Sequence, residues 1–188
     1  MRKIPILPTL IVLVAAGVMV RLGFWQISRL HEKEALLAHY AAARGNPEEV
    51  EWPSTRQAQL DLMYRRARFV CASAASRSSM AGTNASGESG VSQTVQCAGP
   101  GGTNVLVELG WSREPVAGEA WGGGTVHGVI APGPRLVADP PLAGLDANEI
   151  PDPSSIPNNH LSYAVQWFLF AATALVIYAL ALRKRWRG

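Results

Sequence analysis

The chain has 188 residues and a formal net charge of +3, which suits one compact domain with anchors but not two large domains. Such a small positive charge gives no reason to expect nucleic acid as a partner. Uncharged apolar stretches lie near both ends, at residues 4–20 and 161–182. The second would be roughly 33 Å long as a helix, which matches the hydrocarbon core of a bilayer. The sequence therefore predicts a membrane protein with two spans.

The first apolar stretch predicts a transmembrane helix over residues 1–27. Arg2 and Lys3 give it the basic start of a signal peptide, but it ends in bulky Phe24 and Trp25 and no small-x-small cleavage site follows. An uncleaved anchor is therefore favoured. No Arg- and Ser-rich presequence precedes it, which favours a bacterial inner (cell) membrane over mitochondrial import. A mature or truncated chain would look the same.

The next residues predict a helical extension and then a β domain. Residues 28–45 continue the helix until Gly45-Asn46-Pro47 ends it. The domain then occupies residues 46–157, with strands expected at 64–71, 91–97, 104–111 and 125–130. We expect residues 72–90, rich in Ser, Ala and Gly, to form a loop or flexible hairpin connection. Residues 132–157 hold seven prolines and predict an irregular return to the membrane.

The second transmembrane helix is expected over residues 158–182, followed by a basic tail at 183–188. Since basic residues flank the outer end of both spans, both termini are expected in the cytoplasm and the central domain in the periplasm. The predicted fold class is an α+β membrane protein, with two transmembrane helices flanking a small antiparallel β-rich domain.

Two cysteines, Cys71 and Cys97, both fall in the expected exported domain, near the ends of two predicted strands. An oxidising compartment makes a disulfide between them plausible, and two unpaired core thiols are the alternative. Their wide spacing lacks the C-x-x-C pattern of a redox dithiol and disfavours a copper carrier.

Three separated segments carry motifs that together indicate a family. The first is Leu22–Leu30, which contains Gly-Phe-Trp-Gln followed by an arginine three residues after the glutamine. The second is Val105–Trp111, which ends in Gly-Trp. The third is Asn158–Phe168, at the start of the second apolar stretch. In their order, spacing and two-span topology they resemble the surfeit locus protein 1 family of cytochrome c oxidase assembly proteins. One departure is Glu108-Leu109, where the family usually has Asn-Arg, so no role of that arginine carries over.

The resemblance implies a chaperone of respiratory chain biogenesis that binds haem a and assists its delivery to, or retention in, the catalytic subunit. The implied partners are cytochrome c oxidase subunits, above all the haem-bearing one, with haem a synthase and membrane lipid as further partners. The alternative is a scaffold for oxidase subunits that touches no cofactor. An enzyme is not expected, because G-x-S-x-G, H-E-x-x-H and C-x-x-C are all absent from the sequence, although a site in the Ser-rich loop stays open.

Candidate cofactor residues lie at the outer ends of both spans. His160, Tyr163 and Trp167 share a helix face at offsets of zero, three and seven, and Gln166 is expected to point to the other helix. On the first helix the candidates are Gln26 and a stripe with four-residue spacing, formed by Arg21, Trp25, Arg29 and Lys33. A pocket between the two stripes would offer haem an iron ligand in His160, apolar walls and cations for the propionates.

Each candidate also has a structural explanation. His160 could cap its helix or bind a lipid head group, and the tryptophans could be ordinary interfacial anchors. The basic side chains could reach phosphate groups, which we favour for Arg21. Gln26 and Gln166 could bond to each other across the helices. Among the other histidines, His31 is a possible second ligand, whereas His39 and His127 are expected to be structural or exposed.

Overall fold

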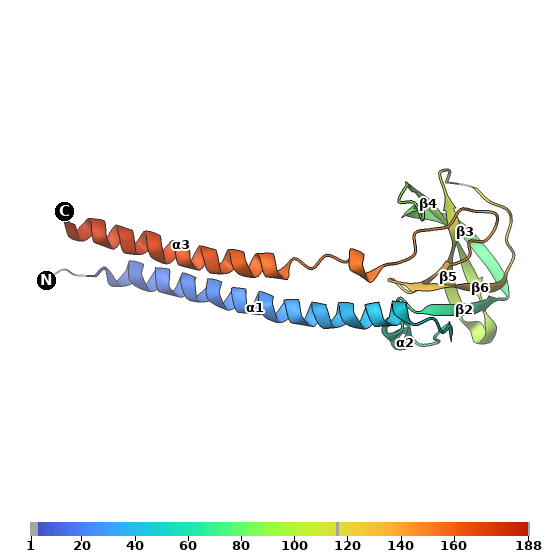
Figure 1. Cartoon of the computed structure of the whole chain (residues 1–188), viewed down its shortest axis with the longest axis horizontal. Coiled ribbons are helices and arrows are strands. Elements are labelled where there is room, and N and C mark those ends of the chain that lie inside the picture. The colour runs from blue at the N-terminus through green and yellow to red at the C-terminus, as the bar shows by residue number, and fades with distance from the viewer. Residues whose placement is uncertain (1–3, 116, 188) are drawn as a thin grey trace. The chain divides into compact units, whose positions relative to one another are not determined.

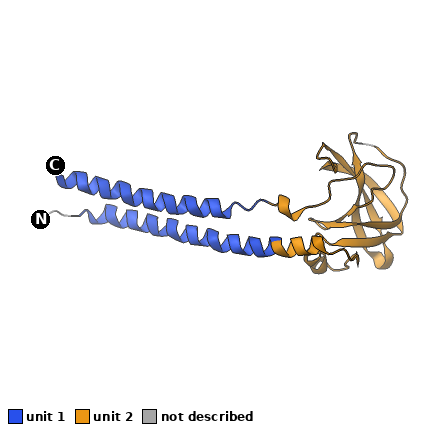
Figure 2. Ribbon diagram, in the orientation of Figure 1, with its two compact units in different colours: residues 1–37, 157–188 blue, residues 38–156 orange. Residues whose placement is uncertain are grey.

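A computed structural model describes residues 4–115 and 117–187 of the chain. It divides into two compact units, which Figure 2 colours separately: residues 1–37 with 157–188, and residues 38–156. Arg2 and Lys3, on which part of the orientation argument depends, lie outside the described residues.

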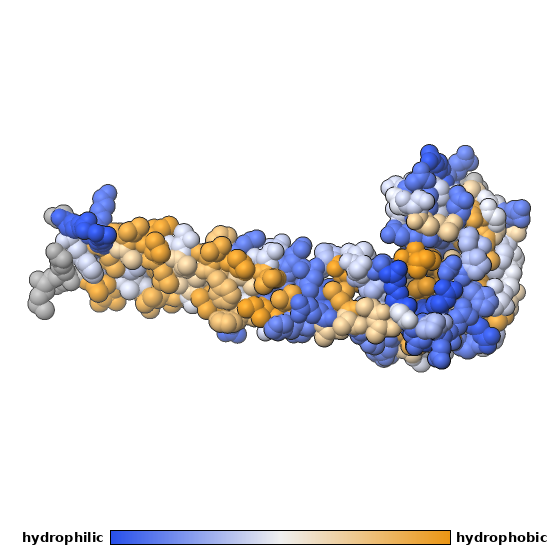
Figure 3. Space-filling view, in the orientation of Figure 1, coloured by the Kyte–Doolittle hydropathy of each residue, from blue (hydrophilic) through white to orange (hydrophobic). Residues whose placement is uncertain are grey.

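The first unit contains helix α3 and α1 as far as residue 37. Helix α1 (Ile6–Gly45) continues past the apolar stretch and ends at the predicted breaker, and α3 (His160–Arg187) carries the second apolar stretch. Within this unit the helices run antiparallel side by side (Figure 1), since Thr9 meets Tyr178 at one end and Gln26 meets His160 at the other. Both are long and apolar enough to cross a membrane, and apolar residues cover much of the surface of the pair (Figure 3). Few of those apolar residues are buried, unlike the core helix of a soluble protein.

The second unit is built around one seven-stranded sheet, with the order β1-β2-β6-β7-β5-β4-β3. The strands are β1 (Val50–Glu51), β2 (Arg66–Cys71), β3 (Ser73–Thr83), β4 (Ser89–Ala98), β5 (Asn104–Ser112), β6 (Gly124–Ala131) and β7 (Arg135–Ala138), with a short helix α2 (Arg56–Asp61) between β1 and β2. The sheet is mixed, because β1 pairs with β2 and β5 pairs with β7 in parallel. The predicted fold class, α+β with two apolar helices flanking a β-rich domain, is confirmed; most strand pairs are antiparallel as expected, and these two are parallel.

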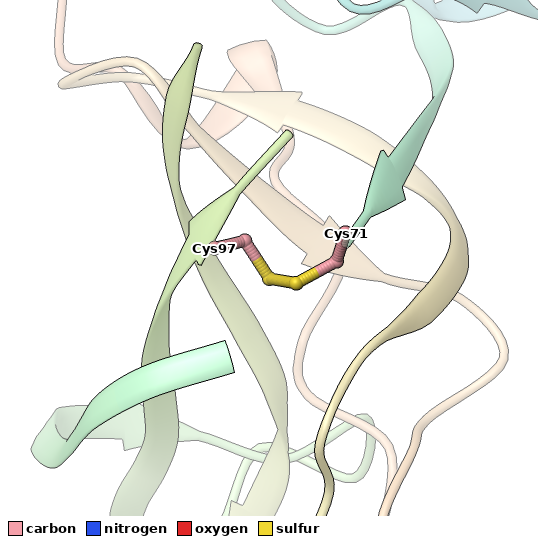
Figure 4. The surroundings of a disulfide bond; sticks show 2 residues. All are labelled: Cys71 and Cys97. Atoms are coloured by element: carbon pink, nitrogen blue, oxygen red, sulfur yellow. A yellow bond between two sulfur atoms is a disulfide. The ribbon is translucent and has the colours of Figure 1, made fainter. Parts of the chain in front are cut away.

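Alternating side chains of the sheet form the core of this unit. Ala67, Phe69 and Cys71 of β2 are buried in alternation with more exposed residues, as a strand covered on one face requires. Cys71 and Cys97 form a disulfide with 5.2 Å between their Cα atoms (Figure 4), so the predicted bridge is confirmed.

Residues 72–90 are mostly not the expected loop. Strand β3 occupies Ser73–Thr83 and pairs with β4 from Ser73 opposite Ala98 to Thr83 opposite Ser89. It is one of the two edge strands of the sheet, and its side chains are mostly small and largely exposed. Backbone hydrogen bonds to β4 therefore hold it, without the apolar alternation that marks a buried strand.

The proline-rich segment contains β7 and then an extended stretch that packs along the sheet. The Leu142 amide donates to the Leu109 carbonyl, and Trp111 and Asp146 exchange backbone hydrogen bonds of 2.7 and 3.2 Å. At Gly110 an added Cβ would lie 2.5 Å from Cβ of Leu145, so the close approach needs glycine. Trp111 itself is buried, which assigns the Gly-Trp motif to core packing.

Candidate cofactor site at the helix seam

Small residues line the interface between α1 and α3, which is called the seam below. Ala16 and Gly23 of α1, and Ala164 and Ala171 of α3, are buried on the facing sides of the two helices. At Gly23 an added Cβ would lie only 2.6 Å from Cε1 of Phe168, so the ring of Phe168 occupies the space that the glycine leaves open. Small residues that admit close backbone approach are the usual means of helix association in a membrane.

A hydrogen bond joins His160 to Gln26 across this seam. Nδ1 of His160 lies 2.7 Å from Oε1 of Gln26, and the imidazole is partly buried at the first residue of α3. Because a carbonyl oxygen only accepts, Nδ1 carries the proton and donates it. In the neutral imidazole, Nε2 would then keep the lone pair that a metal needs. Metal-binding histidines commonly have this arrangement, in which the second nitrogen donates to an oxygen that fixes the ring.

The other candidates on α3 are more exposed. Tyr163 is half exposed, and Trp167 is partly buried with its ring in a T-shaped contact with Phe170. Gln166 is exposed, and Gln26 bonds His160 in its place. The alternative of a hydrogen bond between Gln26 and Gln166 is therefore not found among the described residues. The reason is that Gln166 lies about 240° around the helix from His160, whereas Tyr163 and Trp167 stay within about 60° of it.

The basic and aromatic stripe of α1 lies away from the seam. Trp25 is 53% exposed, and Arg21 and Arg29 are exposed as well. Arg29 pairs with Glu32 on its own helix. Two residues correspond to about 200° of rotation, so Trp25 lies opposite Gly23, which faces α3. The structure therefore does not bring the two stripes together, and a cofactor pocket between them stays a prediction.

The outer side of α1 has a shallow groove of its own, about 380 Å³ in volume, lined by Val18, Arg21, Leu22 and Trp25. It combines apolar walls with one cation, which suits a lipid chain and its head group as well as any cofactor. This position agrees with our preference for lipid contact at Arg21.

The remaining histidines lie elsewhere. His31 is exposed on α1. Nε2 of His39 lies 3.0 Å from the Asp61 carbonyl oxygen, and Nδ1 of His127 lies 2.9 Å from the Glu49 carboxylate. The expectation that His39 and His127 are structural or exposed is thus confirmed.

Sequence reasoning missed Phe168 as a packing residue of the seam and overlooked Gly23 as its partner. The signal was present, since Gly23 precedes Gln26 by three residues and therefore shares its face.

These features define a class of protein: a membrane protein with two spanning helices and a disulfide-bonded β domain. The chain belongs to the SURF1 family, whose family model matches residues 13–172. Membership implies a role as an assembly factor associated with cytochrome c oxidase. No curated protein matches the chain.

Proposed function

We propose that this protein holds haem a during cytochrome c oxidase assembly, and that Nε2 of His160 would bind the iron. The observation that carries the proposal is the His160–Gln26 hydrogen bond, which leaves Nε2 as the free nitrogen. Gln26 acts on the iron indirectly, by fixing the tautomer and the orientation of the imidazole. When bound, the haem would supply the redox-active iron destined for the oxidase.

The residues around His160 fit a haem in part. Tyr163 and Trp167 provide aromatic surfaces on the same side of α3, and their exposure leaves room for a flat macrocycle. The small residues of the seam leave no such room between the helices. In this proposal the haem therefore lies along the exposed edge of the seam, on the Tyr163 side of α3, where the oxidase subunit can reach it. A contribution from Trp25, Arg29 or Gln166 stays a prediction, because it requires these side chains to reach the cofactor from other faces.

We further propose that the β domain lies in the periplasm of a bacterial inner membrane, with both termini in the cytoplasm. The Cys71–Cys97 disulfide supports this placement, since such bonds persist in oxidising compartments. The basic end of α3, which contains Arg183, Lys184, Arg185 and Arg187, supports a cytoplasmic C-terminus. The proposed partners are the haem-bearing catalytic subunit and, upstream, haem a synthase.

The experiment is a visible spectrum of the detergent-purified full chain, coexpressed with haem a synthesis. We expect stoichiometric haem a in the wild type and in His127→Ala, a matched control outside the helices. His160→Ala should lose the haem or shift its spectrum. Gln26→Leu should retain less haem, by about 10-fold to 100-fold in affinity, as for other residues that orient a metal ligand. Haem that His160→Ala retains unchanged would overturn His160 as the ligand and direct attention to His31.

The same hydrogen bond also favours a second function, a scaffold that binds oxidase subunits without cofactor. A His–Gln bond between two helices contributes stability by itself, typically about 1 kcal/mol or less in a membrane. The scaffold predicts that a well-folded wild type carries no haem and that His160→Ala still copurifies with the oxidase subunits. The haem proposal predicts instead that the well-folded wild type carries haem.

A further inference from the structure

The end of α3 remote from His160 has a groove that combines cations with an apolar surface. The groove has a volume of about 500 Å³ and is lined by Leu180, Arg183, Lys184 and Arg187. These residues recur at offsets of zero, three, four and seven, so they share one face of the helix. The hydrophilic end of α3 adjoins the apolar surface of the helix pair (Figure 3). The groove thus lies where the apolar stretch of α3 ends and its basic tail begins.

The groove faces away from α1. Tyr178 bonds Thr9 of α1 and therefore marks the side of α3 that contacts the other helix. Leu180 follows Tyr178 by two residues, which correspond to about 200° of rotation. Leu180 is accordingly 56% exposed. In a bilayer, lipid would therefore cover this side of α3.

The cations of the groove are not neutralised within the first unit. Arg183, Lys184 and Arg187 are exposed, and none takes part in an ion pair among the described residues. The acidic residues of this unit are Glu32 and Glu34, which lie toward the other end of the helix pair. The carbonyl groups at the end of α3 supply only about half a negative charge. The groove therefore attracts an anion from outside the chain.

An apolar strip continues from the groove toward the middle of α3. Val176 and Ile177 precede Leu180 by four and three residues, so they lie on the same face. Both are more than half exposed. A ligand that fills the groove and the strip needs an anionic group for the cations and a long apolar chain for the strip. A soluble anion or an acidic peptide would leave the strip uncovered.

We propose that this groove binds an anionic phospholipid of the surrounding bilayer. The lipid phosphate accepts hydrogen bonds from the three cations, and an acyl chain lies along the apolar strip. A zwitterionic phospholipid is disfavoured, because its own ammonium group would lie among those cations. The inference is independent of haem binding, since it uses the end of α3 remote from His160.

The test measures lipid binding to the detergent-purified full chain by native mass spectrometry. The probes are dioleoylphosphatidylglycerol, which is anionic, and dioleoylphosphatidylcholine, which is zwitterionic and has the same acyl chains. The proposal predicts saturable binding of phosphatidylglycerol at concentrations at which phosphatidylcholine does not bind. Inorganic phosphate and a hexaglutamate peptide should not displace the lipid, because neither covers the apolar strip.

Two arginines of the tail give a matched pair of variants. Arg183 lines the groove, whereas Arg185 does not and lies about 140° around the helix from Leu180. Both are exposed, so replacing either by Gln should preserve the fold and removes the same charge. Arg183→Gln should weaken phosphatidylglycerol binding about fivefold, the effect of one basic side chain at an anionic membrane surface. Arg185→Gln should change it less than about twofold, because its side chain is outside the groove.

Several results would overturn the proposal. Equal binding of the two lipids would show that the cations do not select the head group. Equal weakening by Arg183→Gln and Arg185→Gln would show a general attraction to the basic tail, and no weakening by Arg183→Gln would place the lipid elsewhere. Displacement by inorganic phosphate would identify a site for free phosphate, and displacement by hexaglutamate would identify an acidic polypeptide as the occupant.

Discussion

Replacing Gly23 by Ala tests whether close packing at the seam holds the two helices together. Gly17, on the same helix, is the control, because a Cβ added there meets nothing within 4 Å. Alanine at either position gains the helix preference that glycine lacks, about 0.5–1 kcal/mol. Only at Gly23 does the new methyl group lie 2.6 Å from the Phe168 ring.

The expected penalty at Gly23 follows from this distance. The ring must retreat by about 1 Å to reach an ordinary carbon–carbon contact near 3.5 Å. Overpacking of this kind typically costs about 1–3 kcal/mol. After the gain in helix preference, we expect Gly23→Ala to weaken helix association by about 0.5–2 kcal/mol, and Gly17→Ala to strengthen it slightly.

The assay is an SDS titration in mixed micelles, which separates helices without removing the apolar solvent. Energy transfer between dyes on cysteines introduced at Leu7 and Leu180, both exposed, reports the separation. The double variant Gly23→Ala/Phe168→Leu should recover part of the lost helix association, because the smaller leucine side chain makes room for the methyl group. If Gly23→Ala stabilised the pair as much as Gly17→Ala does, close packing at this position would be refuted.

Three further predictions concern the β domain, each measured by denaturant unfolding of the full chain. Replacing Cys71 and Cys97 together by Ala should lower the free energy of unfolding by about 3.5 kcal/mol, from the 26-residue separation of the bridge, and an unchanged value would contradict the bridge's role. Glu108→Leu should cost about 3 kcal/mol by leaving Arg135 without its partner, and Arg135→Met added to it should restore part of that. Hydrogen bonding from Ser154 lowers the pKa of Asp152 below its ordinary 3.8. The stabilising effect of this carboxylate is therefore present above pH 3.8 and is lost as the pH falls through the lowered pKa. Asp152→Asn should remove this part of the acid sensitivity, which lies below pH 3.8.

The parts of the fold that follow from local sequence were predictable. The Gly45-Asn46-Pro47 breaker ends α1, and the alternating apolar residues of β2 give a buried strand face. Strand β3 was not predictable in this way, because a strand of Ser, Ala and Gly at a sheet edge has no apolar face. The parallel pairing of β5 with β7 could not be predicted from local sequence either, since it joins residues far apart in the chain through backbone hydrogen bonds.

The helical positions of the candidate residues were predictable from the sequence, but the helix faces that pack together were not. Helical spacing correctly places His160 at the start of α3 and puts Tyr163 and Trp167 near it. The same spacing does not indicate which side of α1 faces α3, because both sides of a membrane helix are apolar. The four-residue stripe through Trp25 was therefore assigned to the seam, although Gly23 and Gln26 form it.

Neighbouring positions in the Gly23–Gln26 segment thus serve different environments. Gly23 and Gln26 face α3, where the first admits the Phe168 ring and the second bonds His160. Trp25, between them, is exposed on the other side, as an interfacial anchor in a membrane would be. A haem held by His160 would therefore depend on Gln26 more than on Trp25, although both belong to the same short motif. If Trp25→Ala removed haem and Gln26→Leu did not, the ligand would not be the imidazole that this seam orients.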